Sequence, residues 1–230
     1  MIAGLLFDKD GTLFDFNASW SAWASNTISD LSEGNAARKS ALAHAIGFDL
    51  EARRFFPDSG AIAGTLSWIV DQMAPHVSMS RPALETYLIE ATSVAPMVPA
   101  VALKPLMAEF RRRGLRIGVA TNDAEASARA HLTEAGIVED FHFIAGYDSG
   151  FGAKPEPGMI LAFAEQMNLS PTQVLMVGDS THDLSAGRAA GAQTLGVLTG
   201  PATEADLALW ADAILPDIGA IPDWLEAHPR

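Results

Sequence analysis

The stretch IAGLLFDKDGT, residues 2–12, joins an apolar run to a pair of acids and a glycine. The near-continuous apolar character of residues 2–7 predicts a β-strand that is buried on both faces. Asp8 and Asp10 follow this strand directly, and Gly11 permits a tight turn behind them. Because ligands of open α/β sheets lie outside the carboxyl ends of the strands, these acids are the first candidates for a functional site.

Similar short apolar runs recur along the chain and alternate with longer helical patterns. The further predicted strands are 115–120, 141–145, 174–177, 194–198 and 213–215. The predicted helices are 101–113, 125–135, 157–167, 182–190 and 203–210. Gly114, Gly136 and Gly191 each follow one of them, where a left-handed helix stop is often needed. The alternation predicts an α/β fold: a three-layer, Rossmann-like core with a mainly parallel sheet.

One long segment breaks the alternation. From about residue 16 to residue 98 no strand pattern is found, only helical periodicity interrupted by glycines and prolines. Because this segment falls between the first and second strands, we interpret it as an inserted α-helical subdomain, the cap. The predicted domains are a catalytic α/β core of residues 1–15 and 99–230, and a cap of residues 16–98. Pro96 and Pro99 would mark the return to the core.

Composition limits the partners. The chain has 230 residues, 49% of them apolar, which suffices for an ordinary core. Its net charge of −13 repels nucleic-acid phosphates and anionic membranes, and its lack of cysteine excludes disulfides and thiol chemistry. No basic signal-peptide flank and no apolar run near the roughly 18 residues of a membrane span is present. We expect a soluble cytoplasmic protein, monomeric or homodimeric, with a small-molecule partner rather than nucleic acid or a membrane.

Polar residues gather at the carboxyl ends of several predicted strands. Carboxylates, a hydroxyl and an ammonium on one rim suit a hard cation with an anionic oxygen ligand, which means Mg²⁺ with phosphate. The candidate residues are Asp8, Asp10, Thr121, Asn122, Lys154, Asp179 and Asp183.

Each group has a chemical task. Of the two carboxylates after the first strand, one can act as nucleophile while the other transfers protons. Asp179 and Asp183 offer oxygen ligands to Mg²⁺, which would offset the repulsion between carboxylates and phosphate. Thr121 and Asn122 stand just before a predicted helix, where backbone N–H groups favour an anion. Lys154 supplies a compact positive charge.

Four segments resemble the motifs of the haloacid dehalogenase-like hydrolase superfamily: FDKDGTL (7–13), VATN (119–122), AKPEP (153–157) and VGDSTHD (177–183). Their order and spacing are similar to those of the phosphoglycolate-phosphatase-like branch, whose helical cap lies between the first and second motifs. The resemblance implies that Asp8 attacks phosphorus and forms an aspartyl-phosphate. It implies that Asp10 protonates the leaving oxygen and then takes a proton from the hydrolytic water.

The resemblance also implies a ligand set. Mg²⁺ would be held by Asp8, the backbone carbonyl of Asp10 and Asp179, with Asp183 as a ligand through water or a positioning group. Thr121 and Lys154 would bind phosphoryl oxygens, and we add Asn122 as a phosphate-binding candidate. The predicted function is Mg²⁺-dependent hydrolysis of a small phosphomonoester, phosphoglycolate-like or a sugar phosphate. Two alternatives stay open: a phosphomutase of the same fold, and a non-catalytic regulatory protein that retains the fold.

The cap offers fewer signals. Arg53 and Arg54 lie just before a loop rich in glycine and proline, and they are our candidates for contacting an anionic leaving group. Trp20 and Trp23, three residues apart on one helix face, are interpreted as packing residues of the cap or of its contact with the core. His182 is interpreted as a spectator within the fourth motif, and no histidine spacing indicates zinc.

Overall fold

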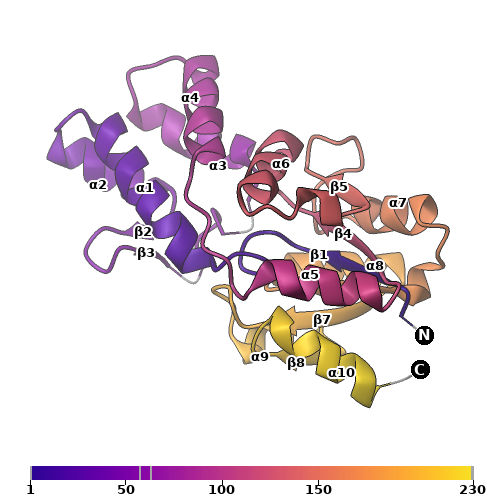
Figure 1. Ribbon diagram of the computed structural model, residues 1–230. Helices are drawn as coiled ribbons and strands as arrows, with labels where there is room; N and C mark the ends of the chain where they lie inside the picture. Colours follow the sequence, from indigo (N-terminus) through magenta and orange to yellow (C-terminus); the bar gives the residue numbers. More distant parts are fainter. Residues whose placement is uncertain (1, 57, 63, 229–230) are drawn as a thin grey trace.

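The computed structural model describes residues 2–56, 58–62 and 64–228, and its largest element is a parallel sheet (Figure 1). The first strand, β1 (Gly4–Phe7), lies at its centre, and the six strands have the order β5-β4-β1-β6-β7-β8. The other strands are β4 (Arg116–Ala120), β5 (Phe143–Ala145), β6 (Val174–Gly178), β7 (Gln193–Val197) and β8 (Ala213–Leu215). Every neighbouring pair is parallel. The predicted α/β fold is confirmed.

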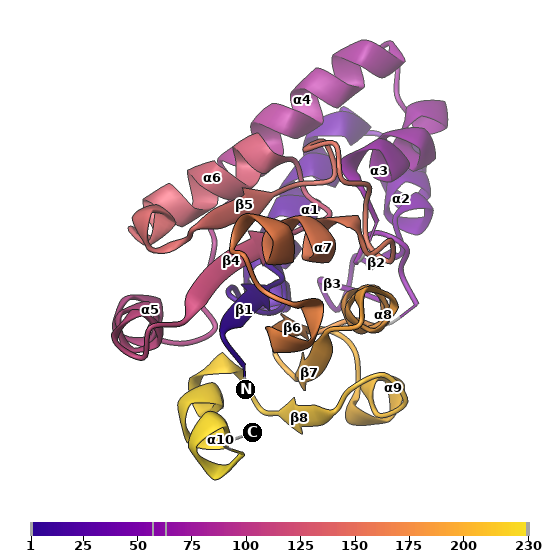
Figure 2. The same cartoon turned by 90° about the vertical axis from the view of Figure 1, so that its right-hand side faces the viewer.

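Helices cover both faces of the sheet (Figure 2). One face carries α5 (Leu103–Arg112), α6 (Glu125–Glu134) and α10 (Ile221–Ala227). The other carries α7 (Gly158–Gln166), α8 (Thr181–Ala190) and α9 (Glu204–Leu207). Side chains alternate between the two faces: Leu5 and Phe7 join the apolar cluster of the first face, and Leu6 that of the second.

Two core helices differ from the sequence prediction. The helix predicted over 203–210 covers only Glu204–Leu207, where Thr203 caps the first turn and accepts a hydrogen bond from the backbone N–H of Asp206. The chain leaves the helix before Trp210, whose carbonyl accepts a hydrogen bond from Thr194 Oγ1 at the start of β7 instead. The helix α10 was not predicted, because it is short and begins next to a proline, Pro222.

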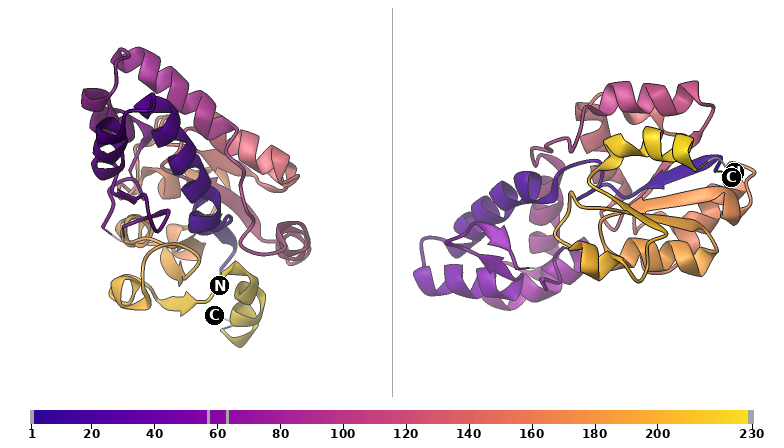
Figure 3. Two further views of the ribbon diagram at one scale, coloured as in Figure 1. Left: turned by 90° about the vertical axis from the view of Figure 1, so that its left-hand side faces the viewer. Right: turned by 90° about the horizontal axis from the view of Figure 1, so that it is seen from below.

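The segment predicted as a cap lies beyond one end of the sheet (Figures 1 and 3). Its helices are α1 (Phe16–Ser32), α2 (Ala36–Ala45), α3 (Leu66–Met73) and α4 (Arg81–Ser93). They enclose an apolar cluster of their own. In the described ranges, none of the helices has the length and apolarity needed to cross a bilayer.

The cap also contains strands, and the prediction that it has none is wrong. A short antiparallel pair, β2 (Phe48–Asp49) and β3 (Arg54–Phe55), is held by a turn in which Asp49 Oδ1 accepts hydrogen bonds from two backbone N–H groups. Two residues per strand are too few for any alternating pattern to be visible in the sequence.

Two crossings connect the cap to the core, and they lie side by side. Phe14 forms an antiparallel bridge with Pro99, and the backbone N–H of Asp15 donates to the carbonyl of Val98 at 2.8 Å. The separate apolar cluster and this paired crossing support our proposal that the chain divides at residues 15/16 and 98/99.

Candidate active site

A pocket of about 80 Å³ lies where the strands β1, β4 and β6 end. Because neighbouring parallel strands end at the same edge of a sheet, loops that are far apart in sequence meet here. The structure thereby brings together every predicted residue of the core. The predicted residues that line the pocket are Asp8, Asp10, Thr121, Asn122, Lys154, Asp179 and Asp183.

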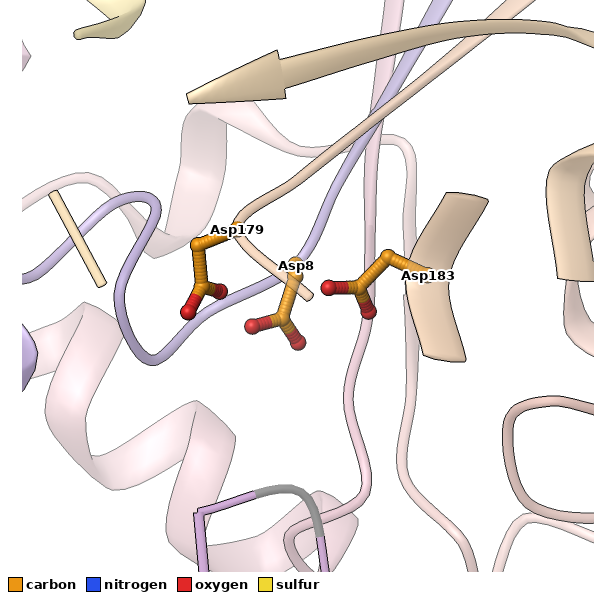
Figure 4. Close-up of side chains that lie close together, drawn as sticks. All are labelled: Asp8, Asp179 and Asp183. Atoms are coloured by element: carbon orange, nitrogen blue, oxygen red, sulfur yellow. The ribbon is translucent and has the colours of Figure 1, made fainter. Parts of the chain in front are cut away.

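Three buried acids form the centre of the site. One carboxylate oxygen each of Asp8, Asp179 and Asp183 lies within 4.8 Å of the others, and Figure 4 shows the three carboxylates close together. All three residues are less than a tenth exposed. Carboxylate oxygens are the donors that Mg²⁺ prefers, and a cation would relieve the repulsion among three buried acids. The donor set therefore fits a magnesium ion.

Two glycines make room for Asp179. A β-carbon placed on Gly11 or on Gly200 would overlap the Asp179 carboxylate. Gly11 also has φ of +81°, a conformation that side chains other than glycine rarely adopt. The tight turn expected after the first strand is therefore present, and it leaves the space that the Asp179 carboxylate occupies.

Lys154 bridges two of the acids. Its Nζ donates to Asp8 Oδ1 at 2.5 Å and to Asp183 Oδ1 at 2.6 Å, and the residue is only 4% exposed. The other oxygen of Asp183, Oδ2, accepts hydrogen bonds from the hydroxyl and the backbone N–H of Ser180 at the start of α8. Both oxygens of Asp183 are thus held by protein donors, and Asp8 shares the Lys154 ammonium with Asp183.

The loop that carries Lys154 is fixed by Asn122. The Asn122 side chain accepts a hydrogen bond from the Lys154 backbone N–H at 2.8 Å and donates to its carbonyl at 3.0 Å. These contacts show Asn122 positioning Lys154, and phosphate binding by Asn122 stays a prediction. Thr121 is buried beside it, and its Oγ1 accepts from the backbone N–H of Asp123.

Burial governs the protonation of this cluster. It raises the pKa of Asp8 to about 7, against the lowering effect of Lys154 and with a further rise from the charge of Asp183. Burial likewise raises the pKa of Asp179 well above its usual range, and the neighbouring acids add to the effect. Burial alone would lower the pKa of Lys154, but the charges of Asp183 and Asp8 raise it. Lys154 therefore stays charged, whereas Asp8 and Asp179 ionise reluctantly without a metal cation.

The carboxylate of Asp10 has different neighbours from those of the three central acids. Its Oδ1 accepts a hydrogen bond from Lys9 Nζ at 2.8 Å and another from Trp20 Nε1 at 2.8 Å. Trp20 belongs to α1, so a cap residue holds an acid of the core. Asp10 is also the more exposed carboxylate, at 16% of its side chain against 10% for Asp8. The two acids of the first motif are thus held in different surroundings.

Behind Asp10 lies a buried polar network that the sequence analysis missed. Lys9 is fully buried, and its Nζ lies 3.3 Å from Asp123 Oδ2 and 3.2 Å from His131 Nδ1. His131 Nε2 lies 2.8 Å from the carbonyl oxygen of Thr92 in α4, which links the network to the cap. Burial, followed by the charge of Lys9, lowers the pKa of His131. The one signal in the sequence was the rare lysine between the paired acids.

The cap supplies the opposite wall of the pocket, and Phe55 of β3 is part of it. Arg54 precedes Phe55, and successive side chains of a strand point to opposite faces. Arg53 and Arg54 are accordingly exposed and do not belong to the described lining, so the structure does not bring them to the acids. Trp20, interpreted from the sequence as a packing residue only, lines the pocket and binds Asp10. His182 lines it too, and its spectator role stays a prediction.

Comparison with known proteins agrees with the fold and the four motifs. Residues 2–191 match the family model described as haloacid dehalogenase-like hydrolase. This match covers well over half of the chain, so the protein belongs to the haloacid dehalogenase-like hydrolases, as the resemblance of its motifs predicted.

The relatives of this chain include proteins named phosphoglycolate phosphatase. The Rhodospirillum rubrum protein is 33% identical over 120 residues, 52% of this chain and 50% of that protein. The Pseudomonas putida protein is 26% identical over 202 residues, 85% of this chain and 69% of that protein. The match thus spans half the length of the first relative. A haloacid dehalogenase-like hydrolase from Bacteroides fragilis has the same fold, with a TM-score of 0.72 at 20% identity, covering 96% of this chain and all of that one.

Proposed function

We propose that this protein is a phosphatase that hydrolyses a small phosphomonoester through an aspartyl-phosphate, with Mg²⁺ as cofactor. The observation that carries the proposal is the pairing of Lys154 with a buried group of three acids, while Asp10 is held apart from that group. The pocket, at about 80 Å³, is small for a ligand site, which suits a small ester. The names of the relatives agree with this substrate class.

Mg²⁺ would be held by Asp8, Asp179 and, as the family resemblance implies, the backbone carbonyl of Asp10. Asp183, whose two oxygens are held by Lys154 and Ser180, fits a positioning role or a contact through water. When bound, the ion would neutralise charge on the transferred phosphoryl group.

The nucleophile in this proposal is Asp8. Its carboxylate oxygen forms a bond to phosphorus as the bond from phosphorus to the leaving oxygen breaks. Lys154 holds one oxygen of Asp8 in place, and its charge can also attract the phosphoryl oxygens. Thr121, buried at the end of β4, would bind a further phosphoryl oxygen through its hydroxyl.

Asp10 moves the protons. It gives its proton to the leaving oxygen in the first step, and it takes one from the water that attacks the aspartyl-phosphate in the second. This water attack regenerates the Asp8 carboxylate and releases inorganic phosphate. Lys9 and Trp20 keep the Asp10 carboxylate at the pocket wall, where it can reach the leaving group.

A screen of phosphate esters with Mg²⁺, and with EDTA as control, tests the proposal. We expect Mg²⁺-dependent release of phosphate from at least one small ester. Replacing Asp8 by Asn should lower kcat by at least about a thousandfold, because no other group can accept the phosphoryl group. The matched control is Asp223→Asn, an exposed acid of α10, which should retain full activity. Equal activity of Asp8→Asn and the wild type would refute the assignment of Asp8 as the nucleophile.

The phosphomutase alternative uses the same residues and returns the phosphoryl group to substrate. Steady-state release of inorganic phosphate separates the two, since a mutase releases little. A non-catalytic protein that retains the fold would turn over none of the esters. The presence of Asp8, Asp10, Lys154 and Asp179 around one pocket favours the phosphatase over that reading.

A further inference from the structure

The wall of the pocket that faces the catalytic acids consists largely of apolar cap side chains. Six of these side chains are at most 9% exposed, so they form a closely packed surface. The residues are Phe16, Trp20, Trp23, Phe55, Leu66 and Ile69. A leaving group that projects from the phosphoryl site toward the cap would therefore meet aromatic rings and branched aliphatic chains.

Positive charge is scarce in this pocket. Lys154 is the single lysine or arginine among the described residues that line it, and it is bound to Asp8 and Asp183 at the phosphoryl end. Lys9 is buried outside the described lining, with its charge directed at Asp10 and Asp123. The lysines and arginines of the cap also lie outside the described lining: Arg38, Lys39, Arg53, Arg54 and Arg81.

Negative charge, in contrast, is concentrated there. Five aspartates line the pocket, namely Asp8, Asp10, Asp123, Asp179 and Asp183. A carboxylate or second phosphate that projects toward the cap would lose its hydration there, and the described lining of the cap wall offers no lysine or arginine to receive it. His182 is the one further basic side chain of the described lining, and it is an exposed residue on the core side, next to Asp183.

Trp23 is a further uncharged side chain of the cap wall. Trp23 is 5% exposed, and its Nε1–H has no hydrogen-bond partner in the described structure. Because Trp23 carries no charge, it offers no counter-ion to an anionic leaving group.

We propose that the leaving group of the substrate is uncharged and largely apolar, so that neutral alkyl phosphates are preferred over esters whose alcohol carries a carboxylate, such as phosphoglycolate. This inference rests on the proposed phosphatase function and narrows its substrate class. It replaces the anionic leaving group that Arg53 and Arg54 had suggested, since the described pocket contains neither side chain.

Three esters of nearly equal size test the charge preference. They are phosphoglycolate, its amide 2-amino-2-oxoethyl phosphate, and isobutyl phosphate, whose leaving groups are respectively anionic, neutral polar and apolar. We expect kcat/KM for the amide and for isobutyl phosphate to exceed that for phosphoglycolate by about tenfold or more, measured as phosphate release with Mg²⁺.

A single substitution in the cap provides an internal control. Ile62 lines the pocket and is partly exposed, so a longer side chain can be accommodated there. Ile62→Lys should shift the preference ratio toward phosphoglycolate by about tenfold, whereas the uncharged Ile62→Met should keep the wild-type ratio. The measured quantity is the ratio of kcat/KM for a neutral ester to kcat/KM for phosphoglycolate. A substitution that lowers activity on both esters by the same factor leaves this ratio unchanged.

The outcomes separate the two proposals. Hydrolysis of phosphoglycolate as fast as its amide, or faster, would overturn the inference about the leaving group and leave the phosphatase intact. Failure of all three esters, together with a wider panel, would refute the proposed function and the inference with it. A preference for the neutral esters that Ile62→Lys reduces and Ile62→Met retains would support both.

Discussion

The indole N–H of Trp20 donates a hydrogen bond of 2.8 Å to Oδ1 of Asp10, which joins the first helix of the cap to an acid of the catalytic core. Hydrogen bonds to a charged acceptor contribute about 1.5–3 kcal/mol. This contact exists only while the cap is packed against the core, so it couples the position of the cap to the position of the proposed proton donor.

Trp20→Phe keeps an aromatic ring at this position and removes the donor. We expect kcat to fall by roughly ten- to a hundredfold, because Asp10 loses one of the two hydrogen bonds that hold its Oδ1. Steady-state kinetics on the best substrate measure the effect. Trp210→Phe, which alters a partly exposed indole of the core, should change kcat by less than about twofold. If both variants behave alike, the hydrogen bond does not position Asp10.

Lys9→Met should destabilise the fold. Lys9 is fully buried and compensates the charges of Asp10 and Asp123, so the variant leaves two carboxylates without their shared cation. Breaking a buried ion pair from one side typically costs about 3–5 kcal/mol. Urea denaturation measures the free energy of unfolding. The control, Lys39→Met, removes an exposed lysine of α2 and should leave this quantity nearly unchanged. A similar stability for both variants would show that the buried network contributes little.

Stability without metal should depend on pH. The pKa of Asp8 is about 7 in the folded protein, against an ordinary value of 3.8. The folded state therefore binds the additional proton between these values, and the stabilisation is complete below about pH 4 and is lost as the pH rises through about 7. In EDTA we expect a lower free energy of unfolding at pH 8 than at pH 5, and Asp8→Asn should reduce this difference.

Mg²⁺ should restore the free energy of unfolding that is lost at high pH, because it binds the ionised acids of the folded protein. Urea titrations at both pH values, with and without Mg²⁺, measure this effect. A larger stabilisation by Mg²⁺ at pH 8 than at pH 5 is expected. Equal stabilisation at both values would show that the ion does not bind the Asp8 cluster.

Gly200→Ala should weaken metal binding more than it weakens the fold. The new methyl group would overlap the Asp179 carboxylate, which can rotate away more easily than the backbone can shift. We expect the Mg²⁺ concentration for half-maximal activity to rise by about tenfold. Gly34→Ala places its methyl group where no atom lies within 4 Å and should leave the Mg²⁺ requirement unchanged, at some cost in stability from the positive φ of +76°.

The sequence was most informative where its signals are local. An apolar strand followed by acids and a glycine predicts β1 and its loop, because strand burial and turn formation depend on adjacent residues. The strands of the core were predicted to within two residues at each end. The pair β2 and β3 could not be predicted, since its four residues form a strand only through a turn held by Asp49.

The missed part of the site depends on contacts between distant residues. Lys9 and His131 are 122 positions apart, and nothing near either of them in the chain indicates that they meet. Trp20 is only 10 positions from Asp10, but its N–H reaches the acid because α1 leaves the core in one particular direction. Packing of the cap against the core determines both contacts, and no short motif records it.

The adjacent crossings at Phe14 and Pro99 restrict how the cap can move. Because the two connecting segments lie side by side, they form a hinge. The cap would therefore rotate about one axis relative to the core rather than move freely. Trp20 would move with the cap, whereas Asp10 would stay in place with the core. A swing that opened the cap would break the hydrogen bond between them, so the Trp20–Asp10 contact is specific to the closed arrangement of cap and core.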